Sequence, residues 1–209
     1  MRLVLASNNR KKLAELQALL APAGVLLVAQ QSLGIAEAEE PHLTFIENAL
    51  AKARHAARAS GGPAIADDSG LCVDALGGAP GVFSAHFASI VLPAAEREAQ
   101  RQLQDAANNA LLLDRLEGVA DRRARFVSTL VALRSADDPE PLVAVGRWHG
   151  EILSTPSGSG GFGYDPLLFI PALGCAVAEL GSEVKNAHSH RAIASVQMLQ
   201  LMREAWQLG

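Results

Sequence analysis

The fold of this chain is decided by the stretch Pro63-Ala64-Ile65-Ala66-Asp67-Asp68-Ser69-Gly70-Leu71-Cys72-Val73. Its first apolar run, 64–66, predicts a short buried strand, and two aspartates follow that run directly. Ser69-Gly70 has the composition of a turn and precedes a second apolar run, 71–73. The stretch therefore predicts two carboxylates at the end of a buried strand, followed by a turn.

Two interpretations of these carboxylates are open. Open α/β sheets bind ligands at the carboxyl ends of strands, and paired carboxylates beside a turn suit an oxygen-preferring cation such as Mg²⁺. Alternatively, Asp-Asp-Ser-Gly is only a polar turn in which Asp68 or Ser69 bonds its own backbone. The stretch alone favours the polar turn, so evidence for a metal site has to come from the rest of the chain.

Composition narrows the class of protein. The chain has 209 residues, of which 49% are hydrophobic, so it is long enough for one domain, residues 1–209, with room for two lobes. The formal net charge is -4, and the longest run of basic residues is Arg10-Lys11-Lys12. We therefore expect no nucleic acid polymer as a partner, whereas a small anionic ligand needs only a few placed cations.

The cysteines and the N-terminal residues bear on the compartment. Cys72 and Cys175 form neither a Cys-x-x-Cys pair nor a disulfide framework, which is typical of a reducing compartment. The apolar run 3–6 is too short for a signal peptide, and no later segment has the length of a membrane span. We expect a cytoplasmic protein with no membrane partner.

The N-terminal residues predict a strand, a loop and a helix. The apolar run 3–6 is followed by Ser7-Asn8-Asn9-Arg10-Lys11-Lys12, and leucines then recur at helical spacing, at positions 13, 16, 19 and 20. A capped helix N-terminus offers free N–H groups to phosphate, and Lys12 adds a full positive charge there. The alternative is a capped surface helix whose lysines are only solvated.

A second helix follows an acidic loop. Pro22 and Gly24 end the first helix and 26–29 predicts a strand, after which Glu37, Glu39 and Glu40 form the loop. Such clusters usually face solvent. Thr44-Phe45-Ile46-Glu47 fits a capping box for a helix that runs to about residue 60. Because Glu47 has this structural task, Glu40 is the better candidate for a metal ligand.

The middle of the chain predicts a helix and a hairpin. A long helix is expected from about 94 to 117, with Asn108-Asn109 as a candidate break, and Gly118 stops it. The runs 125–133 and 142–145 then predict two paired strands, which Trp148 and Ile152 continue.

A glycine-rich segment, 157–166, includes Gly161-Phe162-Gly163-Tyr164-Asp165-Pro166. A strand-like run, 167–170, follows where a dinucleotide fingerprint requires a helix, so the segment argues against that motif. Glycines here allow close approach to a ligand, on whose base Phe162 and Tyr164 could stack. The alternative is a flexible hairpin loop with buried aromatic rings. In the last helix, Ser189 is a candidate N-cap, and His190 and Arg191 are candidate hydrogen-bond donors.

A cationic phosphate-type site, an acidic metal-type site and aromatic rings beside glycines together indicate nucleotide chemistry. Five motifs in order, over most of the chain, resemble the inosine triphosphate pyrophosphatase family, whose members hydrolyse deaminated purine nucleoside triphosphates to the monophosphate and pyrophosphate. They are Ser7-Asn8-Asn9-Arg10-Lys11-Lys12, Thr44-Phe45-Ile46-Glu47-Asn48-Ala49, Ala66-Asp67-Asp68-Ser69-Gly70-Leu71, Gly161-Phe162-Gly163-Tyr164-Asp165-Pro166 and Ser189-His190-Arg191. The resemblance implies an elongated α/β fold with a mixed β-sheet flanked by helices, two lobes around a central cleft, and a homodimer.

The resemblance also implies residue roles. Asp68 would be the proton acceptor and a Mg²⁺ ligand, with Glu40 as the second metal ligand and Lys12 stabilising the transition state. The expected triphosphate contacts are Ser7, Asn8, Asn9, Arg10, Lys11, Lys12 and Lys185, with Ser69 as a further substrate contact. The expected base contacts are Phe162, Gly163, Tyr164, Asp165, His190 and Arg191.

Two departures from the family pattern stand out. Asn8 occupies a position where many members have Gly, and the segment 87–109 is longer than usual. Two alternative functions stay open: a related house-cleaning pyrophosphatase with another modified-nucleotide preference, and a nucleotide sensor without enzyme activity.

Overall fold

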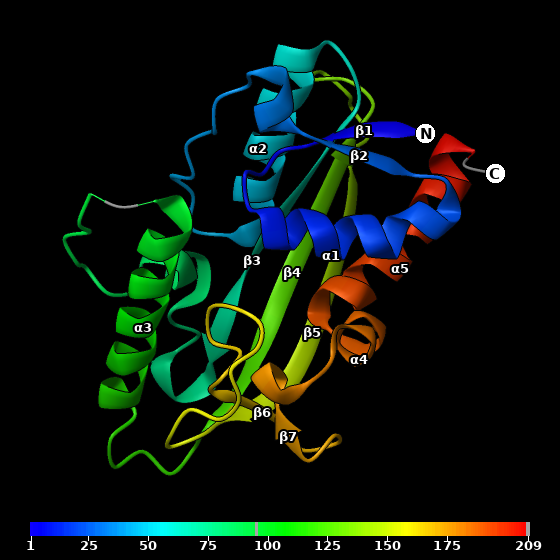
Figure 1. The fold of residues 1–209 in the computed structure, drawn as a ribbon. Coiled ribbons are helices and arrows are strands. Elements are labelled where there is room, and N and C mark those ends of the chain that lie inside the picture. Colours follow the sequence, from blue (N-terminus) through cyan, green and yellow to red (C-terminus); the bar gives the residue numbers. More distant parts are fainter. Residues whose placement is uncertain (95, 208–209) are drawn as a thin grey trace. The chain divides into compact units, whose positions relative to one another are not determined.

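The computed structural model describes residues 1–94 and 96–207, which form an α/β fold with a seven-stranded mixed sheet flanked by helices (Figure 1). The predicted fold class is confirmed. The strands are β1 (Arg2–Leu5), β2 (Leu26–Ala29), β3 (Ala64–Val73), β4 (Arg123–Leu133), β5 (Leu142–Ile152), β6 (Leu168–Ile170) and β7 (Cys175–Ala176), in the order β2-β1-β3-β4-β5-β6-β7. The helices are α1 (Arg10–Leu20), α2 (Phe45–Ser60), α3 (Arg97–Arg115), α4 (Ser182–His188) and α5 (His190–Trp206), with short 3-10 turns between elements.

The chain falls into two compact units. Unit 1 comprises Met1–Ser69, Val127–Arg147 and Asn186–Gly209, and unit 2 comprises Gly70–Phe126 and Trp148–Lys185. The assignment of residues 1–209 to one functional domain, and the cleft between two lobes, stay predictions. Within residues 1–94 and 96–207, no helix is long and apolar enough to cross a membrane.

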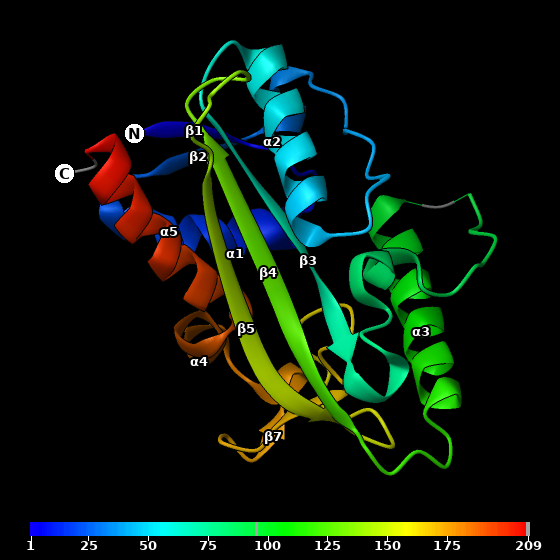
Figure 2. The ribbon, with the colours of Figure 1, turned by 180° about the vertical axis from the view of Figure 1, so that it is seen from behind.

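Unit 1 has a three-layer arrangement that follows from the alternation of side chains along β1. This strand pairs in parallel with β2 and with the start of β3. Leu3 and Leu5 join an apolar core with residues of α1 and α5, whereas Val4 and Ala6 join a second core with the alanines of α2. Because successive side chains of a strand point to opposite faces, α1 and α5 cover one face and α2 the other (Figures 1 and 2).

The prediction that β3 stops before a polar turn is wrong. It runs unbroken through Asp67, Asp68 and Ser69 to Val73. Gly70 permits close packing instead of a turn: a side chain there would overlap the carbonyl oxygen of Gly81 and the hydroxyl of Ser84. The strand that ends beside the aspartates is β1, whose Leu5 is paired with Ile65. Asp67 and Asp68 therefore lie just beyond the end of β1.

Unit 2 has its own apolar core, in which α3 packs with β-strand residues such as Phe126 and Trp148. The candidate break near Asn108-Asn109 is not observed, because α3 runs unbroken from Arg97 to Arg115. The Asn108 amide donates to the carbonyls of Ser84 and Ala85, and its oxygen accepts from the N–H of Ala88. This asparagine is buried in an unbroken helix and ties the preceding segment to it.

Candidate active site

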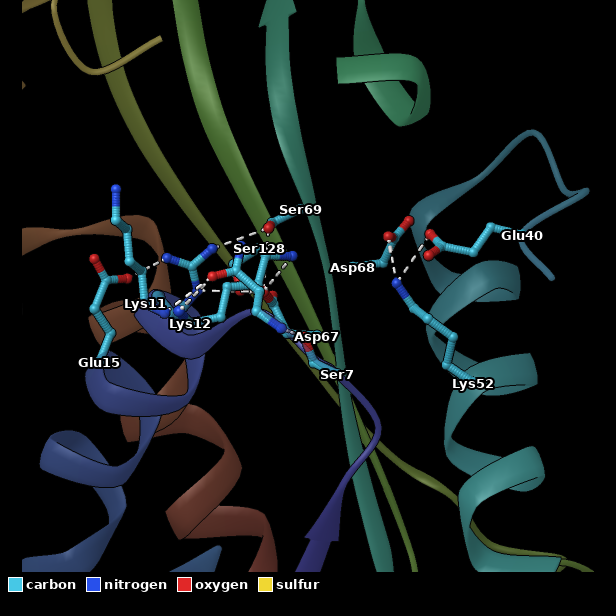
Figure 3. A network of polar contacts seen from close by, with 12 residues as sticks. Ser7, Lys11, Lys12, Glu15, Glu40, Lys52, Asp67, Asp68, Ser69 and Ser128 are labelled. Atoms are coloured by element: carbon cyan, nitrogen blue, oxygen red, sulfur yellow. Dashed lines mark hydrogen bonds and ion pairs between the residues drawn. The ribbon is translucent and has the colours of Figure 1, made fainter. Parts of the chain in front are cut away.

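A fully buried carboxylate, Asp67, organises the polar centre of unit 1 (Figure 3). Lys12 Nζ lies 3.0 Å from Asp67 Oδ2, and Arg191 Nε donates to the same oxygen at 3.2 Å. The hydroxyl of Ser128, on β4, donates to the other oxygen at 2.7 Å. Asp67 thus joins the start of α1, the start of α5 and the middle of the sheet.

Arg191 is almost completely buried and is held on several sides. Besides Asp67, its guanidinium donates to Glu15 and, at 3.0 Å, to the hydroxyl of Ser69. Ser69 in turn donates to Asp67 at 3.1 Å. The observed contacts of Arg191 bind α5 to β3 and α1, and its predicted contact with a base stays a prediction.

Gly146 on β5 allows α5 to begin so close to the sheet. A side chain at Gly146 would overlap the carbonyl oxygen of His190 and crowd the N–H of Ala194. Ser189 caps the helix by accepting from the N–H of Ala192 at 3.1 Å, as predicted. The first turn of α5, with the buried His190, therefore lies directly on β5.

The second cluster of charge in unit 1 has Lys52 at its centre (Figure 3). Lys52 Nζ donates to Asp68 Oδ1 at 2.8 Å and to Glu40 Oε2 at 3.0 Å. The structure therefore brings the two predicted metal ligands onto one ammonium group. Asp68 Oδ2 is buried and has no hydrogen-bond partner among the described residues.

The loop that carries Glu40 is fixed by α2. Asn48 forms two hydrogen bonds with the backbone of His42, one from each end of its amide. Thr44 caps the helix, and Glu47 accepts from the Thr44 hydroxyl instead of from its backbone N–H. Glu47 thus takes part in capping α2, as predicted, but through the Thr44 hydroxyl and not through the backbone bond of a capping box.

The pKa values of the two neighbouring aspartates are shifted in opposite directions. Burial disfavours the charge of Asp67, but Lys12 and Arg191 outweigh it and hold the pKa far below its ordinary range. Burial raises the pKa of Asp68 to about 6, since the charge of Lys52 offsets this only in part. Asp67 is therefore a permanent anion, whereas Asp68 can exchange a proton near neutral pH.

Burial also acts on the cations. It lowers the pKa of Lys12 despite the attraction of Asp67, with Lys52 and Arg191 adding repulsion. For Lys52, burial is outweighed by Asp68 and Glu40, so its pKa is raised. Lys52 therefore stays protonated, whereas Lys12 loses its proton at a lower pH than an ordinary lysine does.

The predicted phosphate loop lines a pocket of about 280 Å³. Its lining residues are Ser7, Asn8, Asn9, Arg10, Leu13, Ala29, Gln31 and Ser32. Asn9 caps α1 by accepting from the N–H groups of Lys11 and Lys12, at 3.0 and 3.2 Å. Since Asn9 occupies these N–H groups, phosphate binding by the free helix end would require Asn9 to move.

In unit 2, Asp165 brings the other predicted residues together. It accepts from Lys185 Nζ at 2.8 Å and from the N–H of Phe162 at 2.9 Å. The Lys185 ammonium also lies 4.7 Å from the centre of the Phe162 ring. A side chain at Gly161 would overlap the Asp165 carboxylate, so this glycine allows close approach to a protein group.

Tyr164 has a different environment from Phe162. Its ring is buried in the core of unit 2, and its hydroxyl donates to the carbonyl of Ser84 at 2.9 Å. Burial raises its pKa, with Asp105 adding to the effect. The ring of Tyr164 packs within the protein, whereas Phe162 is half-buried; the base contacts of both, and of Gly163, stay predictions.

From the sequence, Asp67 is one of two paired carboxylates for a cation such as Mg²⁺, whereas in the structure Asp67 is engaged by Lys12, Arg191 and Ser128. Sequence reasoning did not assign roles to Lys52, Ser128 or Glu15. A signal for Lys52 was present, because a lysine at position 52 falls on the same helical face as Ala49, Ala53 and Ala56. A lysine within an apolar stripe needs a partner for its charge. Ser128 and Glu15 lie far from Asp67 in the sequence, and nothing in their local pattern indicates the contact.

Comparison with known proteins shows the family of this chain. Two proteins named dITP/XTP pyrophosphatase are each 72% identical to this chain: one from Methylibium petroleiphilum over 206 residues, covering 99% of both chains, and one from Leptothrix cholodnii, covering 100% of both. The solved structure of a HAM1 protein from Coxiella burnetii has a TM-score of 0.85 at 41% identity, covering 98% of this chain and 100% of its own. The Ham1 family model matches residues 3–201. With the five motifs in place and a match over nearly its whole length, the chain belongs to the Ham1 family.

Proposed function

We propose that this protein hydrolyses dITP, ITP, XTP and dXTP to the nucleoside monophosphate and pyrophosphate, and so removes these nucleotides before they enter DNA or RNA. The observation that carries the proposal is the 72% identity, over the full chain, to proteins named dITP/XTP pyrophosphatase. The chemistry of Asp68 and its neighbours supports it.

Asp68 is the proposed proton acceptor. As the oxygen of an attacking water bonds to phosphorus, the bond from phosphorus to the pyrophosphate oxygen breaks, and the water proton passes to an oxygen of Asp68. A general base is most effective when its pKa lies near the working pH, and the pKa of Asp68 is raised to about 6 by burial. Its unpartnered Oδ2 is the oxygen available for the proton.

Lys12 and Lys52 are the proposed electrostatic groups. Phosphoryl transfer spreads negative charge over the phosphate oxygens, so fixed cations nearby stabilise the transition state. Lys12 is anchored by Asp67 at 3.0 Å, and Asp67 is anchored in turn by Ser128. We propose that the neighbouring residues Ser7 to Lys11 bind the triphosphate.

The residues around Lys52 fit a Mg²⁺ ion. Among residues 1–94 and 96–207, no group of three His, Cys, Asp or Glu side chains could hold a metal, but Glu40 and Asp68 converge on one point. One or two carboxylates, completed by phosphate oxygens and water, are the usual protein ligands of Mg²⁺. Asp68 Oδ1 and Glu40 Oε2 are the oxygens that face this point, where both now accept from Lys52, so Asp68 Oδ2 stays available for the proton. When bound, the ion would neutralise phosphate charge and orient water.

Base selection is proposed to rest on hydrogen-bond donors. Inosine and xanthosine have a keto acceptor at the position where adenine has an amino donor. His190 and Arg191 are the proposed donors, with Phe162, Gly163, Tyr164 and Asp165 as further base contacts, and Lys185 as a triphosphate contact. His190→Ala should then erode discrimination against ATP, and an unchanged ratio of ITP to ATP hydrolysis would refute the role of His190. We also propose a homodimer and a cytoplasmic location, both by resemblance to the family.

Product analysis tests the proposal. The protein is incubated with dITP, XTP, GTP, ATP and dCTP, with and without Mg²⁺, and products are separated by chromatography, with Asp68→Asn as the control. Monophosphate and pyrophosphate from dITP and XTP only, dependent on Mg²⁺ and Asp68, are expected. Turnover of another modified nucleotide would favour a related pyrophosphatase, diphosphate with orthophosphate would indicate another phosphohydrolase, and binding without turnover would favour a sensor.

A further inference from the structure

Lys52 occupies the point where the two proposed metal ligands meet. Its ammonium is 2.8 Å from Asp68 Oδ1 and 3.0 Å from Glu40 Oε2, and the described residues supply acceptors for only two of its three N–H donors. The side chains of Lys52 and Asp68 are 10% and 8% exposed, whereas that of Glu40 is 46% exposed. Lys52 and Asp68 are thus nearly enclosed, whereas Glu40 is partly open to solvent.

Two carboxylates with a single lysine leave one negative charge uncompensated. Asp68 shows the result, because its second oxygen is buried without a hydrogen-bond partner among the described residues. A buried oxygen in this state costs about 1–3 kcal/mol. A divalent cation at this point would satisfy both carboxylates, but it cannot share the point with an ammonium group because the two cations repel each other.

We propose that Lys52 is a resident counter-ion for the metal site. It holds Glu40 and Asp68 in the metal-free protein and must be displaced by the divalent ion. Its ammonium group then pairs with the nucleotide phosphates. The inference rests on the proposed function, from which it takes the metal site and the triphosphate. Metal alone has to displace Lys52 without compensation, so it binds weakly. A triphosphate accepts the displaced ammonium, so each ligand strengthens the binding of the other by the same factor.

Titration with Mn²⁺ alone, monitored by electron paramagnetic resonance, tests the proposal without any need for turnover. Lys52→Gln removes the competing charge and keeps a polar side chain of similar reach. Arg54→Gln is the matched control, because it removes one positive charge from an exposed position on the same helix. Lys52→Arg retains the charge, and circular dichroism verifies that each variant is folded.

Lys52→Gln is expected to bind Mn²⁺ alone at least about fivefold more tightly than the wild-type protein, the lower end of usual coupling between ligands. Arg54→Gln and Lys52→Arg should bind Mn²⁺ like wild type. With an α,β-methylene analogue of dITP, wild type should gain Mn²⁺ affinity by a larger factor than Lys52→Gln does. This second comparison separates competition by Lys52 from a general effect of charge.

The outcomes separate this inference from the proposed function. If wild type releases pyrophosphate from dITP but Lys52→Gln binds Mn²⁺ no more tightly than Arg54→Gln, the resident counter-ion is refuted and the function stands. If wild type binds no Mn²⁺ with or without the analogue, both the metal site and the counter-ion are refuted.

Discussion

Replacing Asp68 by Asn is expected to stabilise the metal-free fold at pH 8, although it removes the proposed catalytic carboxylate. Burial raises the pKa of Asp68 to about 6, above its ordinary value of 3.8. Each unit of pKa corresponds to about 1.4 kcal/mol, so the ionised side chain costs the folded state roughly 3 kcal/mol. Asn resembles the protonated carboxyl group and keeps an acceptor for Lys52, so it escapes this cost.

The sign of the pH dependence follows from linkage. A carboxyl group whose pKa is higher in the folded state destabilises the fold fully above that pKa, and the penalty disappears as the pH falls toward the ordinary value. The advantage of Asp68→Asn should therefore fall from roughly 3 kcal/mol at pH 8 to about half of this at pH 5. Urea unfolding in EDTA, at several pH values between these limits, measures the difference.

Asp67→Asn is the matched control, one residue away on the same strand. It leaves the buried Lys12 and Arg191 without their shared anion, so a loss of about 3–5 kcal/mol is expected at pH 8. The reasoning is refuted if Asp68→Asn is no more stable than wild type at pH 8, or if its advantage does not change with pH.

Three further substitutions test contacts elsewhere in the two units. Gly146→Ala should cost about 1–3 kcal/mol, or more, because the new methyl group overlaps the first turn of α5; thermal unfolding measures this, and an unchanged midpoint would contradict it. Asn108→Ala should cost about 1–3 kcal/mol in the same assay, since backbone groups of the segment packed on α3 lose their partner; stability equal to wild type would show those hydrogen bonds to be dispensable. Hydrogen bonds from Arg134 lower the pKa of Asp138, so Asp138 stabilises the fold at neutral pH and loses this effect as the pH falls below its ordinary range. Asp138→Asn should therefore lose less stability than wild type as the pH falls into the acid range, as measured by urea unfolding at several pH values. An equal loss in both proteins would count against the Arg134 contact.

Local signals predicted most of the elements. The strand at 26–29 has the predicted bounds, and Thr44, Ser189 and the glycine after Ser60 mark the helix ends as expected. These features depend on residues near one another in the sequence, where periodicity and capping chemistry act directly. Errors arose at Ser69-Gly70 and at Asn108, whose composition is typical of turns but whose roles are set by distant partners.

The site was predicted unevenly for the same reason. The sequence predicted Lys12, Glu40 and Asp68 as site residues, and the structure brings Glu40 and Asp68 onto one lysine. Nothing local distinguishes Asp67 from Asp68. Only the folded chain shows that Asp67 faces two cations and Ser128, whereas Asp68 faces Lys52 and has one unpartnered oxygen.

Unit 1 is built from three separate segments of the chain, and this affects the order in which the two units fold during synthesis. Its apolar core combines Leu3 and Leu5 with Met198 and Met202 of α5, and all of unit 2 lies between them in the sequence. Because chains are made from the N-terminus and units fold as they become complete, unit 2 has all its residues before unit 1 does. We therefore expect β1, although it is synthesised first, to complete its packing last, after α5 has been synthesised. The contact between Asp67 and Arg191 should form only at that stage.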